Sequence, residues 1–205
     1  MTIELILNLG SGNTKPFGYP NDNSTLMINV DSGYQHYQIS SDEEIHNTLM
    51  NYETMNTMNS FDKELFTDMD AFKFLSTQIV KYDKVVAYRF LEHIPHEQVP
   101  YMLYLIGNVL KKDGEFEFIV PDYLKLAKLL IGNDNPKKPS FNNVNTLLTY
   151  EMLADPGCPH CSIWTKNRAE ALLTAENIFE VDEITEDYVA FGRNIYLHVI
   201  AHKVW

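Results

Sequence analysis

The chain has 205 residues, of which 45% are apolar and 21% charged. This composition is typical of a folded globular protein and excludes a disordered or fibrous one. The length predicts a single domain over residues 1–205, large enough to bury a core. The net charge of −12, from 28 acidic and 16 basic residues, would repel a phosphate backbone and disfavours nucleic acid as the principal partner.

The N-terminal sequence MTIELILNLGSGN has an apolar stretch too short to span a membrane, and it lacks the basic start and small-residue cleavage site of a secretion signal. The two cysteines, Cys158 and Cys161, are too few for a disulfide scaffold and agree with a reducing compartment. We therefore expect a cytoplasmic protein without a membrane partner. A first strand beginning at Ile3 leaves no room for an N-terminal lid, so we expect a nearly bare single-domain fold.

Apolar runs alternate with helical patterns along the chain. Strands are predicted at residues 3–9, 26–30, 65–66, 84–88, 115–120, 179–184 and 196–201, and helices at 45–55, 70–79, 102–109, 123–131 and after Thr165. Ser40 and Glu43 predict a capping box for the first helix. This alternation predicts an α/β fold in which helices cover both faces of a mostly parallel sheet.

Ligands of such sheets bind beyond the carboxyl ends of the strands. Gly10-Ser11-Gly12 follows the first strand, and its glycines allow a ligand to approach the backbone closely. Asp31 ends the next strand, about twenty residues on, where a carboxylate can accept hydrogen bonds from two ribose hydroxyls. The pair predicts a nucleoside-containing cofactor. A dinucleotide site needs a third glycine, where this chain has Lys15, whereas S-adenosylmethionine has no phosphate and needs only the two-glycine loop and one acid.

Five segments in order resemble the motifs of class I S-adenosylmethionine-dependent methyltransferases: LILNLGSGN, NVD, TDMDAFKFL, YDKVVAYRFLEHIPHEQ and NVLKKDGEFEFIVPD. The resemblance covers roughly residues 3–122, and it is to small single-domain members such as those of glycan-biosynthesis and phage gene clusters. It implies a Rossmann-like three-layer sandwich with a mostly parallel seven-stranded sheet whose last strand is antiparallel. It also implies S-adenosyl-L-methionine as the cofactor.

Carried over residue by residue, the resemblance implies cofactor contacts at Leu9, Gly10, Ser11, Gly12, Asp31, Asp70, Ala71, Phe72, Tyr88 and Arg89. Within this set Asp31 holds the ribose hydroxyls. Asp70 would meet the adenine amino group, with Phe72 beside the ring and Asp68 as a competing candidate for the acid. Tyr88 and Arg89 lie by the methionine end and the reacting methyl group.

Transfer to a hydroxyl acceptor requires a base near the methyl group. The candidates are His160, His93, Asp122 and Glu92, and histidine suits the role because its usual pKa lies close to neutral pH. Two of them have structural alternatives. His93 belongs to a Glu-His pair that is often structural in the family, and Asp122, just before Tyr123, has good N-cap chemistry.

Cys158-Pro159-His160-Cys161 is a C-x-x-C sequence that resembles the redox pair of thiol oxidoreductases. Such a pair belongs after an early strand, whereas this one lies in an irregular late segment. A zinc site would need two more ligands at suitable spacing, and the sequence shows no partner motif. We therefore predict neither a redox role nor a metal site.

The letters PHCSIWT resemble the H-x-S-x-[WF]-T segment that follows the fifth strand in small methyltransferases. This resemblance implies that His160 and Ser162 lie over the acceptor pocket with Trp164 as a wall. The alternative is that His160 only hydrogen-bonds a loop. Residues 123–164 are expected to form an insertion that selects the acceptor.

The sequence favours methyl transfer from S-adenosylmethionine to a small-molecule or sugar acceptor, at oxygen or nitrogen. One alternative is a non-catalytic cofactor-binding or interaction module, which gains from Asn8 standing where many family members carry an acid. Another is an NAD(P)-dependent oxidoreductase, which Lys15 disfavours.

Overall fold

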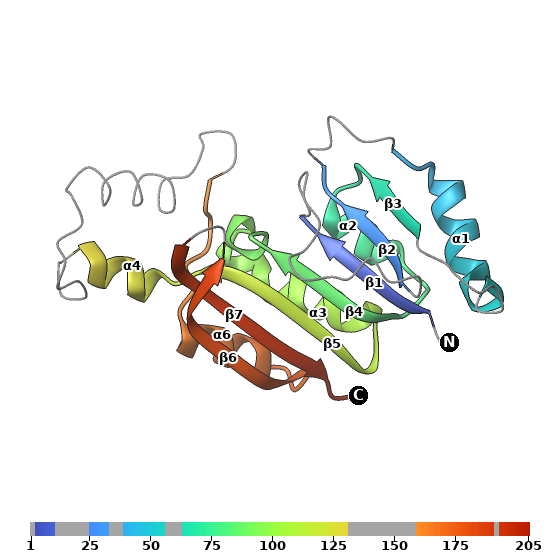
Figure 1. The fold of residues 1–205 in the computed structure, drawn as a ribbon. Helices are drawn as coiled ribbons and strands as arrows, with labels where there is room; N and C mark the ends of the chain where they lie inside the picture. The colour runs from blue at the N-terminus through green and yellow to red at the C-terminus, as the bar shows by residue number, and fades with distance from the viewer. Residues whose placement is uncertain (1–2, 11–24, 33–38, 56–62, 131–158, 191–192) are drawn as a thin grey trace.

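The computed structural model describes residues 3–10, 25–32, 39–55, 63–130, 159–190 and 193–205. These residues form a seven-stranded sheet in the order β3-β2-β1-β4-β5-β7-β6 (Figure 1). The strands are β1 (Glu4–Leu9), β2 (Thr25–Val30), β3 (Lys63–Thr67), β4 (Tyr82–Tyr88), β5 (Leu110–Pro121), β6 (Phe179–Ala190) and β7 (Arg193–Lys203). The first five strands pair in parallel, and β7 runs antiparallel to β5 and β6. The predicted Rossmann-like fold with an antiparallel last strand is confirmed.

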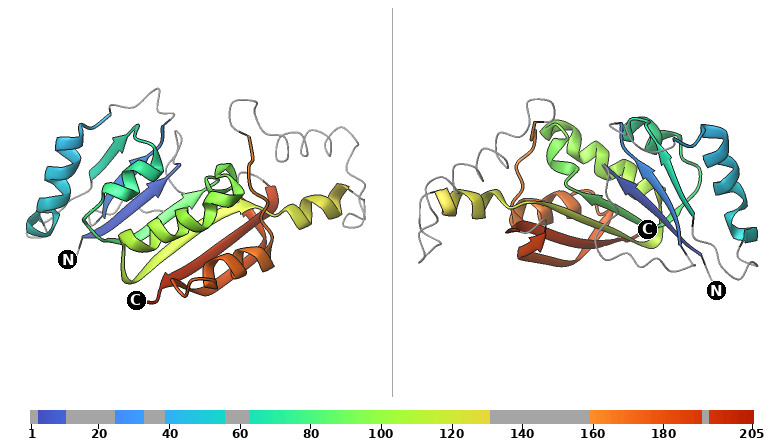
Figure 2. Two further views of the ribbon diagram at one scale, coloured as in Figure 1. Left: turned by 180° about the vertical axis from the view of Figure 1, so that it is seen from behind. Right: turned by 45° about the horizontal axis from the view of Figure 1, so that its top comes forward.

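Helices flank this sheet. They are α1 (Asp42–Met55), α2 (Ala71–Thr77), α3 (Val99–Val109), α4 (Tyr123–Leu130) and α6 (Lys166–Thr174), with single 3-10 turns η1 (Leu91–His93) and η2 (His96–Gln98). The helices α2, α3 and α6 lie over one face of the sheet, and α1 lies beside its β3 edge (Figure 2). Among the described helices, none has the length and apolarity needed to cross a membrane.

The interior strand β1 explains why apolar runs predicted strands so directly. Leu5, Leu7 and Leu9 point into the core shared with α2 and α3, whereas Ile6 belongs to a smaller apolar cluster with residues of β2 and β4. All four side chains are fully buried. Because a strand buried on both faces needs apolar residues at consecutive positions, its sequence is a continuous run and not an alternating one.

The start of α1 differs from the predicted capping box by one residue. The Ser41 hydroxyl accepts a hydrogen bond from the Glu44 amide at 3.1 Å, so Ser41 caps the helix. The Ser40 amide instead donates to the Phe66 carbonyl at 2.8 Å. The prediction of Ser40 as the cap was therefore wrong, because the backbone of Ser40 is held by β3.

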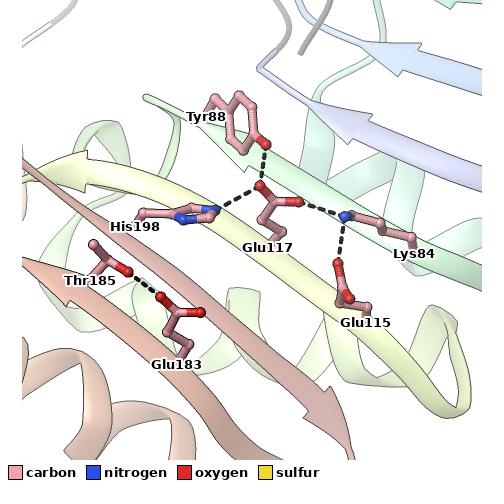
Figure 3. Close-up of polar contacts among 7 residues, drawn as sticks. All are labelled: Lys84, Tyr88, Glu115, Glu117, Glu183, Thr185 and His198. Carbon is pink, nitrogen blue, oxygen red and sulfur yellow. Dashed lines mark hydrogen bonds and ion pairs between the residues drawn. The ribbon is translucent and has the colours of Figure 1, made fainter. Parts of the chain in front are cut away.

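A buried carboxylate organises the opposite face of the sheet (Figure 3). Glu117 on β5 accepts hydrogen bonds from the Tyr88 hydroxyl and, at 2.7 Å, from Nε2 of His198, and it pairs with Lys84. Lys84 also pairs with Glu115. Burial alone would raise the pKa of Glu117, but the hydrogen bonds from His198, Lys84 and Tyr88 outweigh it and hold that pKa at about 2. This network ties together β4, β5 and β7.

Candidate functional site

A cleft of about 260 Å3 opens at the carboxyl ends of β1, β2 and β4. Several predicted residues line it together: Gly10, Asp31, Asp70, Ala71, Phe72, Arg89 and His93. They come from the segments that follow four different strands, β1 to β4. The position agrees with the rule that ligands of parallel sheets bind where the strand order changes direction.

Gly10 shapes the floor of this cleft. Its amide donates to the Val30 carbonyl at 2.8 Å, and its φ is +63°, in the left-handed region that favours glycine. A Cβ on this residue would lie 2.6 Å from Cδ2 of Phe90, which also lines the cleft. The first predicted glycine is therefore required both by its backbone conformation and by the close approach of Phe90.

Two of the predicted acids lie at the cleft. The Asp31 amide donates to the Thr67 carbonyl at 3.1 Å, which fixes the backbone from which its carboxylate projects. Asp70 caps α2 by accepting from the Lys73 amide at 3.1 Å. Asp68, the competing candidate for the adenine role, is exposed and is not part of the cleft lining.

The structure places other predicted cofactor contacts elsewhere. The Leu9 side chain is fully buried in the core under the helices. The Tyr88 hydroxyl donates a hydrogen bond to Glu117, and Tyr88 is not part of the cleft lining. Ser11 and Gly12 lie outside the described residues.

Asn8, which departs from the family pattern, is also part of the sheet. Its side chain is buried and donates from Nδ2 to the Asn29 side-chain oxygen at 2.8 Å. Asn29 in turn donates to the Leu65 carbonyl at 3.4 Å. The Asn8 side chain therefore links β1 to β2.

Arg89 enters the cleft from a strained position. Its φ is +54°, unusual for a residue with a side chain, while its amide donates to the Ile119 carbonyl at 2.8 Å. Its Nε lies 4.0 Å from Oε1 of Glu92. Glu92 is 0% exposed. A guanidinium group of the cleft lining therefore lies close to a buried carboxylate.

The late segment around residues 159–165 is held against η1 by hydrogen bonds. The amides of Cys161 and Ser162 both donate to the Glu92 carbonyl, at 2.7 and 3.0 Å. The Ser162 hydroxyl donates to the Leu91 carbonyl at 2.9 Å and accepts from Nε1 of Trp164 at 2.9 Å. Ser162 and Trp164 are buried, so they anchor the segment, whereas the resemblance implied that they line an acceptor pocket.

This anchoring brings two histidines together. The rings of His93 and His160 are 4.8 Å apart in an edge-to-face arrangement. Nδ1 of His93 lies 3.2 Å from the Pro159 carbonyl, and Nδ1 of His160 lies 2.9 Å from the Tyr123 hydroxyl. Tyr123 is a site residue that the sequence did not indicate, because only the folded chain places it beside His160.

Asp122 and the two cysteines are the other residues that the sequence singled out, and Asp122 has a structural role. Asp122 is buried and caps α4, accepting from the amides of Leu124 and Lys125 at 3.0 and 3.3 Å. Burial, together with the nearby acids Glu186 and Asp187, raises the pKa of Asp122 despite these two hydrogen bonds. Cys161 is exposed, and Cys158 lies outside the described residues.

No family model and no curated protein matches the chain. Solved structures do. An S-adenosylmethionine-dependent methyltransferase from Methanosarcina mazei aligns with 19% identity and a TM-score of 0.57, over 100% of this chain and 94% of that one. The 1,6-didemethyltoxoflavin-N1-methyltransferase of Burkholderia thailandensis aligns with 15% identity and a TM-score of 0.61, over 100% and 72%.

A third similar structure is the plantazolicin methyltransferase BpumL, with 16% identity and a TM-score of 0.60, over 100% of this chain and 78% of that one. At sequence identities of 15 to 19%, the comparison supports a conclusion about the fold alone. The strand order, the antiparallel β7 and the cleft at the strand ends agree with it. The chain has the fold of the class I S-adenosylmethionine-dependent methyltransferases.

Proposed function

We propose that this protein transfers the methyl group of S-adenosylmethionine to an oxygen or nitrogen of a small-molecule acceptor. The observation that carries the proposal is the cleft, which combines the Gly10 turn, the Asp31 carboxylate and the Asp70–Phe72 step at the strand ends. Two of the similar structures support it, since the toxoflavin and plantazolicin methyltransferases were solved with S-adenosylhomocysteine and a small molecule bound.

The residues present fit this cofactor. Asp31 can accept hydrogen bonds from both ribose hydroxyls, and Asp70 and Phe72, which the resemblance assigns to the adenine ring, line the same cleft. The backbone at Gly10 carries no Cβ, so the methionine portion can pass close to it. When bound, the cofactor supplies an activated methyl group on a sulfonium ion. A dinucleotide is disfavoured, because its usual sheet order is 3-2-1-4-5-6, without the antiparallel strand found here between β5 and β6.

Calorimetric titration with S-adenosylhomocysteine tests the cofactor assignment. Asp31→Ala should weaken binding by about 10- to 100-fold, because hydrogen bonds to a charged acceptor contribute about 1.5 to 3 kcal/mol. Asp68→Ala is the matched control, since Asp68 is an exposed acid outside the cleft lining, and it should bind like the unmodified protein. Tight NADH binding with no response to S-adenosylhomocysteine would contradict the proposal.

The acceptor side is assigned to the histidine pair. His93 lines the cleft and His160 lies against it, so together they can take up the proton that a hydroxyl or amine acceptor loses. Asp122 is not proposed as the base, because its carboxylate caps α4. His160→Ala should lower kcat by about 100-fold or more while S-adenosylhomocysteine affinity stays within about twofold. Equal loss of turnover and cofactor affinity would instead assign His160 a structural role.

We further propose that residues 123–164 select the acceptor. In its described parts, residues 123–130 and 159–164, His160 lies against the cleft-lining His93, and the Tyr123 hydroxyl contacts His160. The net charge of −12 favours a neutral or cationic acceptor over a polyanion. A neutral sugar is one acceptor of this kind.

A further inference from the structure

Three potential metal ligands gather beside the cofactor cleft. One donor atom each from Glu92, His93 and His160 lies within 4.8 Å of the other two. Glu92 is fully buried and the two histidines are partly buried. Two imidazoles and one carboxylate form the ligand set of catalytic zinc sites, which keep a fourth position open.

We infer that Glu92, His93 and His160 bind one divalent transition-metal ion, with zinc as the best match. Ligand atoms about 2.1 Å from a tetrahedral zinc ion lie about 3.4 Å from one another, so separations within this cluster, which reach at most 4.8 Å, must contract by no more than about 1.4 Å. Rotation of the two imidazole side chains can supply that movement. A divalent ion also favours the ionised form of the Glu92 carboxylate, whose removal from water is otherwise costly.

Arg89 lies close to the same carboxylate, so its positive charge must be compatible with a bound cation. Its Nε lies 4.0 Å from Oε1 of Glu92, so it supplies one positive charge to this pocket. A carboxylate that binds a metal through one oxygen can face a guanidinium group with the other. The arrangement therefore requires Glu92 to bind through a single oxygen.

The surroundings of the histidines match those of metal ligands. Ligating histidines donate their second ring N–H to a carbonyl, a carboxylate or water, which fixes the tautomer and the ring orientation. Here the Pro159 carbonyl lies 3.2 Å from Nδ1 of His93, and the Tyr123 hydroxyl lies 2.9 Å from Nδ1 of His160. These contacts orient Nε2 as the ligand atom in both rings.

The backbone of this region is already fixed for such a site. The Glu92 carbonyl accepts hydrogen bonds from the amides of Cys161 and Ser162, which follow His160 directly. The two segments that carry the ligands are therefore cross-linked by backbone hydrogen bonds. Such support lowers the entropic cost of ordering the ligands around an ion.

The role of the ion rests on the proposed methyl transfer. With an ion bound, the two histidines act as ligands and no longer take up the acceptor's proton. An acceptor O–H or N–H bound at the open position would instead lose its proton to solvent, because a zinc ion lowers the pKa of a bound group. The acceptor lone pair then forms the bond to the methyl carbon while the sulfur–methyl bond breaks and its electrons stay on sulfur. The products are the methylated acceptor and S-adenosylhomocysteine, and His160 acts through the ion.

The test is a zinc titration of the full chain, freed of metal with a chelator, in competition with a chromophoric chelator. One equivalent should bind. Glu92→Gln, His93→Ala and His160→Ala should each weaken zinc binding by at least about 100-fold, and Tyr123→Phe by about 10-fold. The double variant Cys158→Ser/Cys161→Ser should bind zinc like the unmodified protein. Circular dichroism and thermal melting identify variants that fail to fold, and the conservative Tyr123→Phe then carries the test.

Absence of zinc binding, or loss of binding only in the cysteine double variant, would overturn the inference. The proposed function is tested separately by titrating the metal-free protein with S-adenosylhomocysteine, which should bind with unchanged affinity. Methyl transfer that is indifferent to chelator would reject the proposed role of the ion in the reaction and leave the proposed function standing. Zinc binding that depends on Glu92, without any binding of S-adenosylhomocysteine, would reject the proposed function and leave the metal site standing.

Discussion

Gly10→Ala should reduce S-adenosylhomocysteine affinity by at least about 100-fold, the equivalent of about 2.7 kcal/mol. The added Cβ would lie 2.6 Å from the Phe90 ring, inside van der Waals contact. It would also place a side chain on a residue whose φ is +63°, at a further cost of about 1 kcal/mol. Because Gly10 and Phe90 both line the cleft, any movement that relieves the contact changes the binding surface. Calorimetry measures the loss.

Gly107→Ala provides the matched control. Its Cβ would approach Cγ2 of Ile178 to 2.4 Å, a similar clash, but Gly107 lies on α3 and is not part of the cleft lining. This variant should lose about 1 to 3 kcal/mol of stability and keep its cofactor affinity. Adding Phe90→Ala to Gly10→Ala should relieve the clash but not the backbone strain. If Gly10→Ala binds like the unmodified protein, Gly10 has no part in the site.

The sheet could be predicted from the sequence because burial acts on consecutive residues of each strand. Ile6 and Leu7 point to opposite faces and are both fully buried, so β1 had to be a continuous apolar run. The residue that caps α1, by contrast, could not be predicted correctly from the sequence. Ser40 and Ser41 are adjacent hydroxyl residues, and the choice between them depends on the hydrogen bond from Ser40 to Phe66 across a tertiary contact.

The cofactor half of the site followed from local patterns, because Gly10 and Asp31 each end a strand and parallel strands bring their carboxyl ends to one edge. For the proposed acceptor half, the sequence named Glu92, His93 and His160 as candidate bases but did not show that they lie together. Glu92 and His160 are far apart in the sequence, and backbone hydrogen bonds that no spacing rule reveals bring their segments together. The C-x-x-C and H-x-x-x-H patterns therefore gave no indication of the metal site proposed above.

Tyr88 illustrates a second reason why the surroundings of a residue could not be predicted from the sequence. The resemblance implies a contact with the cofactor, yet the structure gives its hydroxyl to Glu117 on the neighbouring strand. Side chains alternate between faces along a strand, and Tyr88 shares its face with Lys84. The network around Glu117 was not visible in the sequence, since its members come from three strands.

Glu117→Gln should destabilise the protein by about 2 to 4 kcal/mol at pH 7, because removing one partner of a buried ion pair leaves the other uncompensated. Glu117 is 8% exposed and serves Lys84, Tyr88 and His198 together. Urea unfolding measures the difference. Glu183→Gln is the matched control: Glu183 is also a strand carboxylate that accepts a side-chain hydrogen bond, from Thr185, but it is exposed (Figure 3). Its loss should change stability by less than about 0.5 kcal/mol.

The same network predicts the direction of the pH dependence. The pKa of Glu117 is about 2 in the folded protein and about 4.3 for an unperturbed glutamate. A depressed folded pKa contributes stability that is complete above the unfolded value and is lost as the pH falls toward the folded one. Between pH 6 and pH 3 the unmodified protein should therefore lose roughly 1 to 2 kcal/mol through this group, after allowance for solvent screening, and Glu117→Gln should not. The stability difference between the two proteins should narrow over that interval. A constant difference would mean that Glu117 stabilises the sheet through packing and neutral hydrogen bonds, and not through its charge.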